Sequence, residues 1–152
     1  MAGAEAELQR PPARRGMYVV PSLFTSGSIA LGYYIIMQSI RGSVMTDPAI
    51  SSMAFDHAAV AIALAIVFDG LDGRIARMTN TSSAFGRELD SLADVITFGV
   101  APSLLAYLLG VRQLTPSVHP EIEARVMHFG VVVCFLFLIC GACRLEIGRA
   151  HV

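Results

Sequence analysis

The chain has 152 residues, of which 55% are apolar and 15% charged, and its formal net charge is −1. A typical soluble domain is about a quarter charged and just under half apolar. This composition, with a mean hydropathy of +0.63, therefore indicates a membrane protein of one domain at most. All 11 cations are Arg, and a nearly neutral chain with no Arg cluster beyond its N-terminus argues against nucleic-acid binding.

Four uncharged stretches predict four membrane-spanning helices. In chain order they cover residues 16–40, 57–68, 95–111 and 126–143. A helix needs about 20 apolar residues to cross a bilayer, so the second stretch spans only if its helix continues through the charged residues 69–77. The first stretch is too long for a signal peptide and contains Pro21, so we expect it to be retained. The predicted fold class is an all-α, polytopic membrane helix bundle.

The positions of the arginines predict the orientation of this bundle. A cytoplasmic N-terminus places seven arginines on the cytoplasmic side, namely Arg10, Arg14, Arg15, Arg74, Arg77, Arg87 and Arg144. Three lie on the opposite side, namely Arg41, Arg112 and Arg125. The positive-inside rule favours this arrangement, with residues 1–16 as a mobile cytoplasmic tail. Polar linkers are predicted at Gly42–Ser52, Thr79–Ser83 and Gln113–Pro120.

Four aspartates adjoin the second and third predicted helices on the cytoplasmic side. Asp69 and Asp72 are three residues apart, and Asp90 and Asp94 are four apart, so each pair shares one face of its helix. Four ionised carboxylates in one partly desolvated pocket would raise one another's pKa values. A hard divalent cation with oxygen ligands resolves this conflict. From spacing alone, solvated charges at helix ends remain an equal alternative.

The full pattern around these aspartates resembles the signature of the CDP-alcohol phosphotransferase family. It reads Asp69-x-x-Asp72-Gly73-x-x-Ala76-Arg77, eight residues, then Gly86-x-x-x-Asp90-x-x-x-Asp94. Eight fixed positions at about 5% usage each match by chance at roughly 10⁻¹⁰ per starting position. The resemblance extends over about Arg15 to Leu145, and we expect residues 17–145 to form the membrane-embedded domain.

The resemblance implies a role for each motif residue. It implies two divalent cations, Mg²⁺ or Mn²⁺: one held by Asp69, Asp72 and Asp90, the other by Asp69, Asp90 and Asp94. Asp94 would also be the catalytic general base. Gly73, Arg77 and Ser83 would bind the CDP-linked donor, Arg77 at its diphosphate; capping of the next helix is an equally good reading of Ser83.

The sequences around the motif are most similar to the bacterial branch of this family that makes phosphatidylserine. Its marks are Phe-Gly-Val-Ala-Pro after Asp94 and Cys-Gly-Ala-Cys-Arg-Leu ending at Leu145. One departure is Ser22, where this branch has Asn. The resemblance implies transfer of the phosphatidyl group of CDP-diacylglycerol to L-serine, in the bacterial cytoplasmic membrane, by an enzyme with a possible homodimeric state. Arg144 would meet the serine carboxylate or the lipid phosphate, its alternative being a snorkelling anchor.

The sequence is compatible with two other functions. The same chemistry could use glycerol 3-phosphate or an inositol phosphate as acceptor, although such acceptors call for more cations than this interior has. A cation transporter or channel subunit would explain the four aspartates but not Gly73, Arg77 and Gly86 at fixed spacing. Cys140-x-x-Cys143 sits in an apolar helix, which favours small buried hydrophobic residues over a redox or zinc site.

The resemblance stops after Leu145, and the last seven residues read Glu-Ile-Gly-Arg-Ala-His-Val. A common sequencing adapter read in frame encodes this heptapeptide. We therefore expect residues 146–152 to be non-native and the chain to be a fragment of an enzyme with at least six membrane helices.

Overall fold

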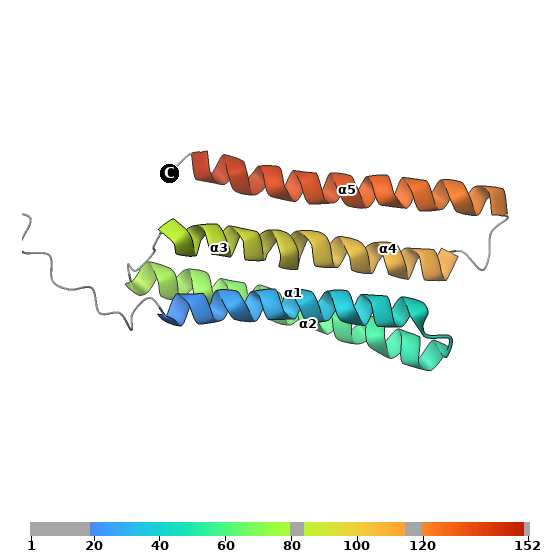
Figure 1. The fold of residues 1–152 in the computed structure, drawn as a ribbon, viewed down its shortest axis with the longest axis horizontal. Coiled ribbons are helices and arrows are strands. Elements are labelled where there is room, and N and C mark those ends of the chain that lie inside the picture. The colour runs from blue at the N-terminus through green and yellow to red at the C-terminus, as the bar shows by residue number, and fades with distance from the viewer. Residues whose placement is uncertain (1–18, 80–83, 115–119, 151–152) are drawn as a thin grey trace, which may run out of the picture.

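The computed structural model describes residues 19–79, 84–114 and 120–150, and all of these except a short turn are helical. The elements are α1 (Val19–Val44), α2 (Pro48–Thr79), α3 (Ala84–Asp94), the π-helix η2 (Val95–Val100), α4 (Ala101–Leu114) and α5 (Pro120–Ala150). As Figure 1 shows, α3, η2 and α4 follow one another as a single rod, with α1 and α2 on one side and α5 on the other.

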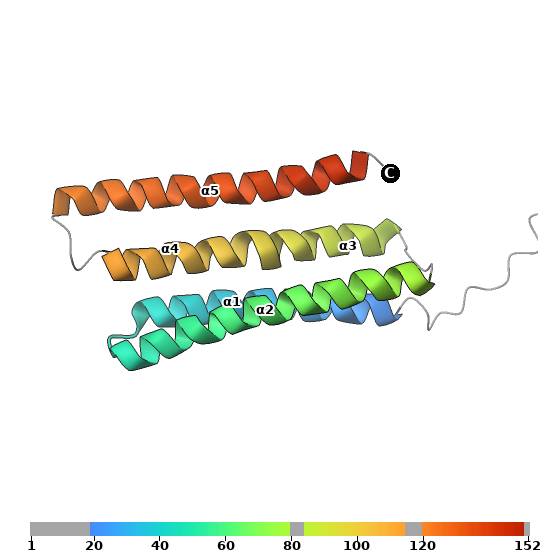
Figure 2. The same cartoon turned by 180° about the vertical axis from the view of Figure 1, so that it is seen from behind.

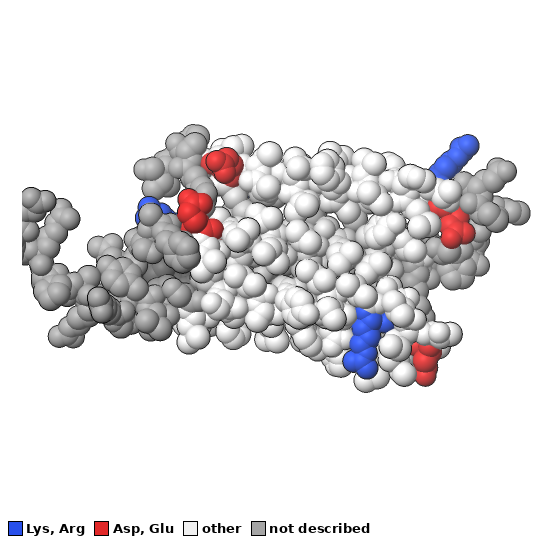
Figure 3. Space-filling view, in the orientation of Figure 1, with Lys and Arg blue, Asp and Glu red and all other residues white. Residues whose placement is uncertain are grey.

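Four spans in the described residues are long and apolar enough to cross a membrane, which confirms the predicted all-α membrane bundle. They cover Leu23–Val44, Pro48–Leu71, Gly86–Val111 and Ile122–Ile147. The second helix does continue through the charged stretch, as its short uncharged run required. The third span begins nine residues before the uncharged stretch at Val95, so Asp90 and Asp94 lie inside it. On the face drawn in Figure 3, charged side chains lie towards the two ends of the helix bundle.

The connection between α1 and α2 is much shorter than the predicted linker Gly42–Ser52. Asp47 caps α2: its Oδ1 accepts the N–H of Ala49 at 2.9 Å, and its carbonyl accepts the N–H of Ser51 at 3.0 Å. Pro48 occupies the first helical position, where its missing N–H costs nothing. Asp47-Pro48 therefore starts a helix here, and the serines after it belong to the first turns of α2.

Small side chains let α1 and α2 pack closely along most of their length. The buried residues of α1 are spaced alternately three and four apart, namely Thr25, Ser28, Gly32, Ile35, Ser39 and Gly42. On α2 the same spacing joins Ser51, Ala54, Ala58, Ala61 and Ala65. Ser51 Oγ donates across to the Gly42 carbonyl at 2.7 Å. In a bilayer such close backbone approach and interhelical hydrogen bonding replace the hydrophobic effect as the source of helix association.

Helix α5 packs on the rod along one antiparallel line of contacts. Leu138 lies against Gly99, Cys134 Sγ donates to the Ser103 carbonyl at 3.3 Å, and Gly130 faces the ring of Tyr107. None of the span Ile122–Ile147 is buried within the described structure. Seen from behind in Figure 2, α5 again forms the outer edge of the bundle. Its remaining apolar surface therefore faces the space outside the described bundle.

Candidate active site

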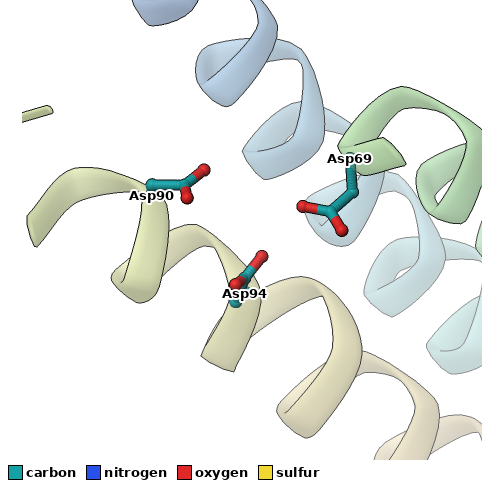
Figure 4. A group of neighbouring side chains, drawn as sticks. All are labelled: Asp69, Asp90 and Asp94. Atoms are coloured by element: carbon teal, nitrogen blue, oxygen red, sulfur yellow. The ribbon is translucent and has the colours of Figure 1, made fainter. Parts of the chain in front are cut away.

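Three of the four predicted aspartates come together at the end of the bundle where α1 begins and α2 ends. Asp69 comes from α2, while Asp90 and Asp94 come from α3. One carboxylate oxygen from each lies within 4.8 Å of the others, and all three residues are half-buried. Figure 4 shows the three side chains directed into one common space. We call these three residues the Asp cluster.

The sequence positions these carboxylates through the packing of α1. Ala65, one turn before Asp69, is fully buried, and Ala93, next to Asp94, is 1% exposed. Both α2 and α3 pack against α1, which brings the two helices that carry the Asp cluster to one common neighbour. The four-residue spacing of Asp90 and Asp94 then directs both carboxylates to the same side of α3.

The donor set of the Asp cluster fits a hard divalent cation. Carboxylate oxygens bind Mg²⁺ at about 2.1 Å, so two oxygens on one octahedral ion are roughly 3 Å apart when adjacent and roughly 4.2 Å apart when opposite. The oxygens of the Asp cluster, all within 4.8 Å of one another, would have to move closer together around a bound ion. Three ionised carboxylates this close repel one another, and a bound cation would offset that repulsion. Asp90 and Asp94 each have at least one further polar or electrostatic interaction.

The other predicted site residues lie on the same elements or outside the described residues. Gly73 is half-buried on α2, one turn beyond Asp69. The side chains of Asp72 and Arg77 are outside the described part of the structure, as is the whole of Ser83. The predicted grouping of four carboxylates is therefore observed for three.

A groove beside the Asp cluster links it to Arg144. The groove has a volume of about 230 Å³ and lies between the rod and α5. Asp94 lines one wall and Arg144 the other, fifty residues later in the chain. The remaining walls are mostly apolar and include Phe98, Gly99, Phe137 and Leu138. The sequence carried no signal for these apolar walls, because their pairing depends on how α5 packs on the rod.

The aspartate cluster at one end of an all-helical membrane bundle is a candidate site for a divalent cation, and comparison with known families identifies the class of protein. Residues 18–151 match the family model described as CDP-alcohol phosphatidyltransferase. The chain belongs to this family and is an integral membrane protein.

Several similar curated proteins carry the name CDP-diacylglycerol–serine O-phosphatidyltransferase. The protein of this name from Helicobacter pylori (strain ATCC 700392 / 26695) is 42% identical over 129 residues, which are 85% of this chain and 45% of the relative. That from Mycobacterium leprae is 42% identical over 139 residues, covering 90% of this chain and 38% of the relative. That from Saccharomyces cerevisiae is 36% identical over 114 residues, covering 75% and 35%.

The chain thus spans less than half the length of these curated relatives. No solved structure gives a significant match.

Proposed function

We propose that the chain carries the metal and donor site of an enzyme that transfers the phosphatidyl group of CDP-diacylglycerol to L-serine, giving phosphatidylserine and CMP. The observation that carries this proposal is the Asp cluster, with carboxylate oxygens within 4.8 Å, formed by three fixed positions of the family signature. The names of the similar proteins support serine as the acceptor.

Asp69, Asp90 and Asp94 would hold the divalent cations, together with Asp72. Two bound Mg²⁺ or Mn²⁺ ions would neutralise charge on the diphosphate and on the attacking and leaving oxygens. The protein's contribution is to hold the four carboxylates in place on two helices. The choice of Mg²⁺ or Mn²⁺ rests on the preference of hard cations for oxygen ligands.

Asp94 is proposed as the general base. Its carboxylate would accept the hydroxyl proton of serine while the serine oxygen forms a bond to the phosphatidyl phosphorus. The bond from that phosphorus to the bridging oxygen breaks, and CMP leaves with the electron pair. Asp94 suits this role because it belongs to the Asp cluster and also lines the groove. A positioned base of this kind contributes roughly 10²–10⁴-fold to the rate.

Three residues are proposed to bind the donor. The backbone at Gly73 would allow close approach of the nucleotide, since it has no Cβ. The Arg77 guanidinium would bind the diphosphate through paired hydrogen bonds, and Ser83 would lie near the cytidine.

Arg144 is proposed to meet the serine carboxylate or the lipid phosphate from the far wall of the groove. The support for this is that Arg144 and Asp94 line the same groove of about 230 Å³. A small acceptor in that groove would place its hydroxyl near the base and its acidic group near the guanidinium.

The active site is proposed to face the cytoplasm from the bacterial cytoplasmic membrane. The support is the excess of arginines on the side of the N-terminus, which is also the side of the Asp cluster. The family resemblance supports a homodimer, which crosslinking in native membranes would test.

The test is CMP release from CDP-diacylglycerol in liposomes containing Mn²⁺, by the chain extended from Leu145 onward with the C-terminal helices of a relative. L-serine, glycerol 3-phosphate and an inositol phosphate are supplied separately, and Asp69→Asn is the matched inactive control. We expect release with serine only, and none after metal chelation. Release with another acceptor would reassign the substrate. An absence of release with every acceptor would refute the proposed function for this chain.

A further inference from the structure

The helix that carries Asp90 and Asp94 changes its winding immediately after Asp94. Residues Val95–Val100 form a π-helix, and the N–H of Ala101 donates to the carbonyl of Ile96, five residues earlier. Pro102 follows closely; it has no N–H to donate to the Phe98 carbonyl and its ring would crowd that carbonyl in a regular helix. A wide turn at this point relieves that conflict, and such turns occur often at functional sites.

This wide turn determines which way α3 faces relative to α4. The buried residues Ala93, Thr97, Ala101 and Leu105 are spaced four apart. At 3.6 residues per turn, Ala93 and Leu105 would point about 120° apart in an uninterrupted α-helix. A π-turn acts as one inserted residue, which reduces this angle to about 20°. The turn therefore keeps one continuous buried stripe on both halves of the rod.

Two contacts with α1 fix the wide turn in place. Thr97 is fully buried, and its Oγ1 donates to the Ser28 carbonyl at 2.9 Å. Gly32, one turn further along α1, lies directly against Thr97: a Cβ on Gly32 would come within 2.8 Å of Thr97 Oγ1 and 3.2 Å of its Cα. Threonine and glycine thus join the turn to α1 by a hydrogen bond and by close packing.

We propose that Thr97 is a positioning residue that sets the rotation of α3 and so directs Asp90 and Asp94 towards Asp69. The inference rests on the proposed function, because it concerns the metal site of that reaction. Loss of the wide turn would rotate α3 by about 100°, which at a helix radius of 5–6 Å moves a side-chain end by roughly 8–9 Å. That displacement exceeds the 4.8 Å within which the cluster oxygens now lie.

The experiment measures Mn²⁺ affinity by electron paramagnetic resonance on the full chain in nanodiscs. Thr97→Val keeps the shape and removes the hydroxyl, and Thr97→Ser restores a hydroxyl as the conservative variant. Gly32→Ala disturbs the same contact from α1. Gly110→Ala is the matched control, because a Cβ there meets nothing within 4 Å. We expect about tenfold weaker Mn²⁺ binding for Thr97→Val and for Gly32→Ala. For Thr97→Val this factor corresponds to the loss of one hydrogen bond to a buried group. Thr97→Ser and Gly110→Ala should stay within twofold of the unchanged chain.

Thermal unfolding and CMP release provide the second readout. For the two disturbed variants, the Mn²⁺ concentration for half-maximal CMP release should rise by a similar factor, with a smaller change in the rate at saturating Mn²⁺. A lower unfolding temperature with unchanged Mn²⁺ affinity would show a merely structural role and overturn the inference, leaving the proposed function intact. An unchanged chain that binds no Mn²⁺ would overturn the metal site and this inference together.

Discussion

Replacing Asp69 by asparagine removes one negative charge from the Asp cluster and keeps the shape of the side chain. Two unit charges at 4.8 Å, the upper limit for the separation of the cluster oxygens, repel by about 3.5 kcal/mol at an effective dielectric constant of 20, and by about 0.9 kcal/mol in water. Asp69 takes part in two of the three pairs. Because the residues are half-buried, solvent screening favours the lower of the two repulsion energies for each pair. The free energy of unfolding of the metal-free variant should therefore rise by about 2 kcal/mol.

This gain should be visible as a thermal shift in detergent with a chelator present. At 2–4 °C per kcal/mol, the Asp69→Asn variant should unfold about 5 °C above the unchanged chain. Mn²⁺ at a hundred times its dissociation constant should stabilise the unchanged chain by about 2.7 kcal/mol and the variant much less, reversing the order. Glu123→Gln, which neutralises a half-buried carboxylate on α5, is the control and should show neither effect. A variant that is less stable than the unchanged chain in chelator would refute the electrostatic reasoning.

Three further substitutions have expected outcomes. Asp94→Asn should lower serine-dependent CMP release by roughly 10²–10⁴-fold while CDP-diacylglycerol binding, measured separately, largely survives; an unchanged maximal rate would assign the base elsewhere. Arg144→Ala should raise the KM for serine more than it lowers kcat. An unchanged KM would show that Arg144 does not bind the serine acceptor. Gly42→Ala should destabilise the protein by about 1–3 kcal/mol in thermal unfolding, because the new Cβ would lie 2.9–3.0 Å from the buried ring of Phe55. Gly110→Ala, with open space around it, should be neutral or slightly stabilising, and equal losses for the two glycines would contradict the packing argument.

The helices were predictable because their signals are local, whereas the grouping of Asp69 with Asp90 and Asp94 was expected from the resemblance to the family signature. Uncharged runs mark the spans, and the four-residue spacing of Asp90 and Asp94 directs both carboxylates to one side of α3. The predicted linker Gly42–Ser52 is wrong at the start of α2, because Asp47-Pro48 fits a turn and a helix N-terminus equally well and only the hydrogen bonds distinguish the two.

The wide turn and the groove could not be predicted, because both depend on contacts between distant parts of the chain. Thr97 bonds to a carbonyl 69 residues earlier, and nothing near it in the sequence indicates that partner. Arg144 and Asp94 line one groove only because α5 packs antiparallel to the rod. Local spacing gives the faces of each helix, whereas the rotation of one helix against another is set by packing.

The contrast between α5 and the other helices has a consequence for membrane insertion during synthesis. The segment Ile122–Ile147 is uncharged from residue 126 to residue 143, and none of it is buried within the described bundle. It can therefore leave the translocon into lipid without waiting for a partner helix. The first helix has three buried polar residues, and neighbouring helices are what cover them in the bundle. They are Thr25, Ser28 and Ser39. We expect α1 to remain beside the translocon until α2 emerges, so that these two helices enter the bilayer as a hairpin.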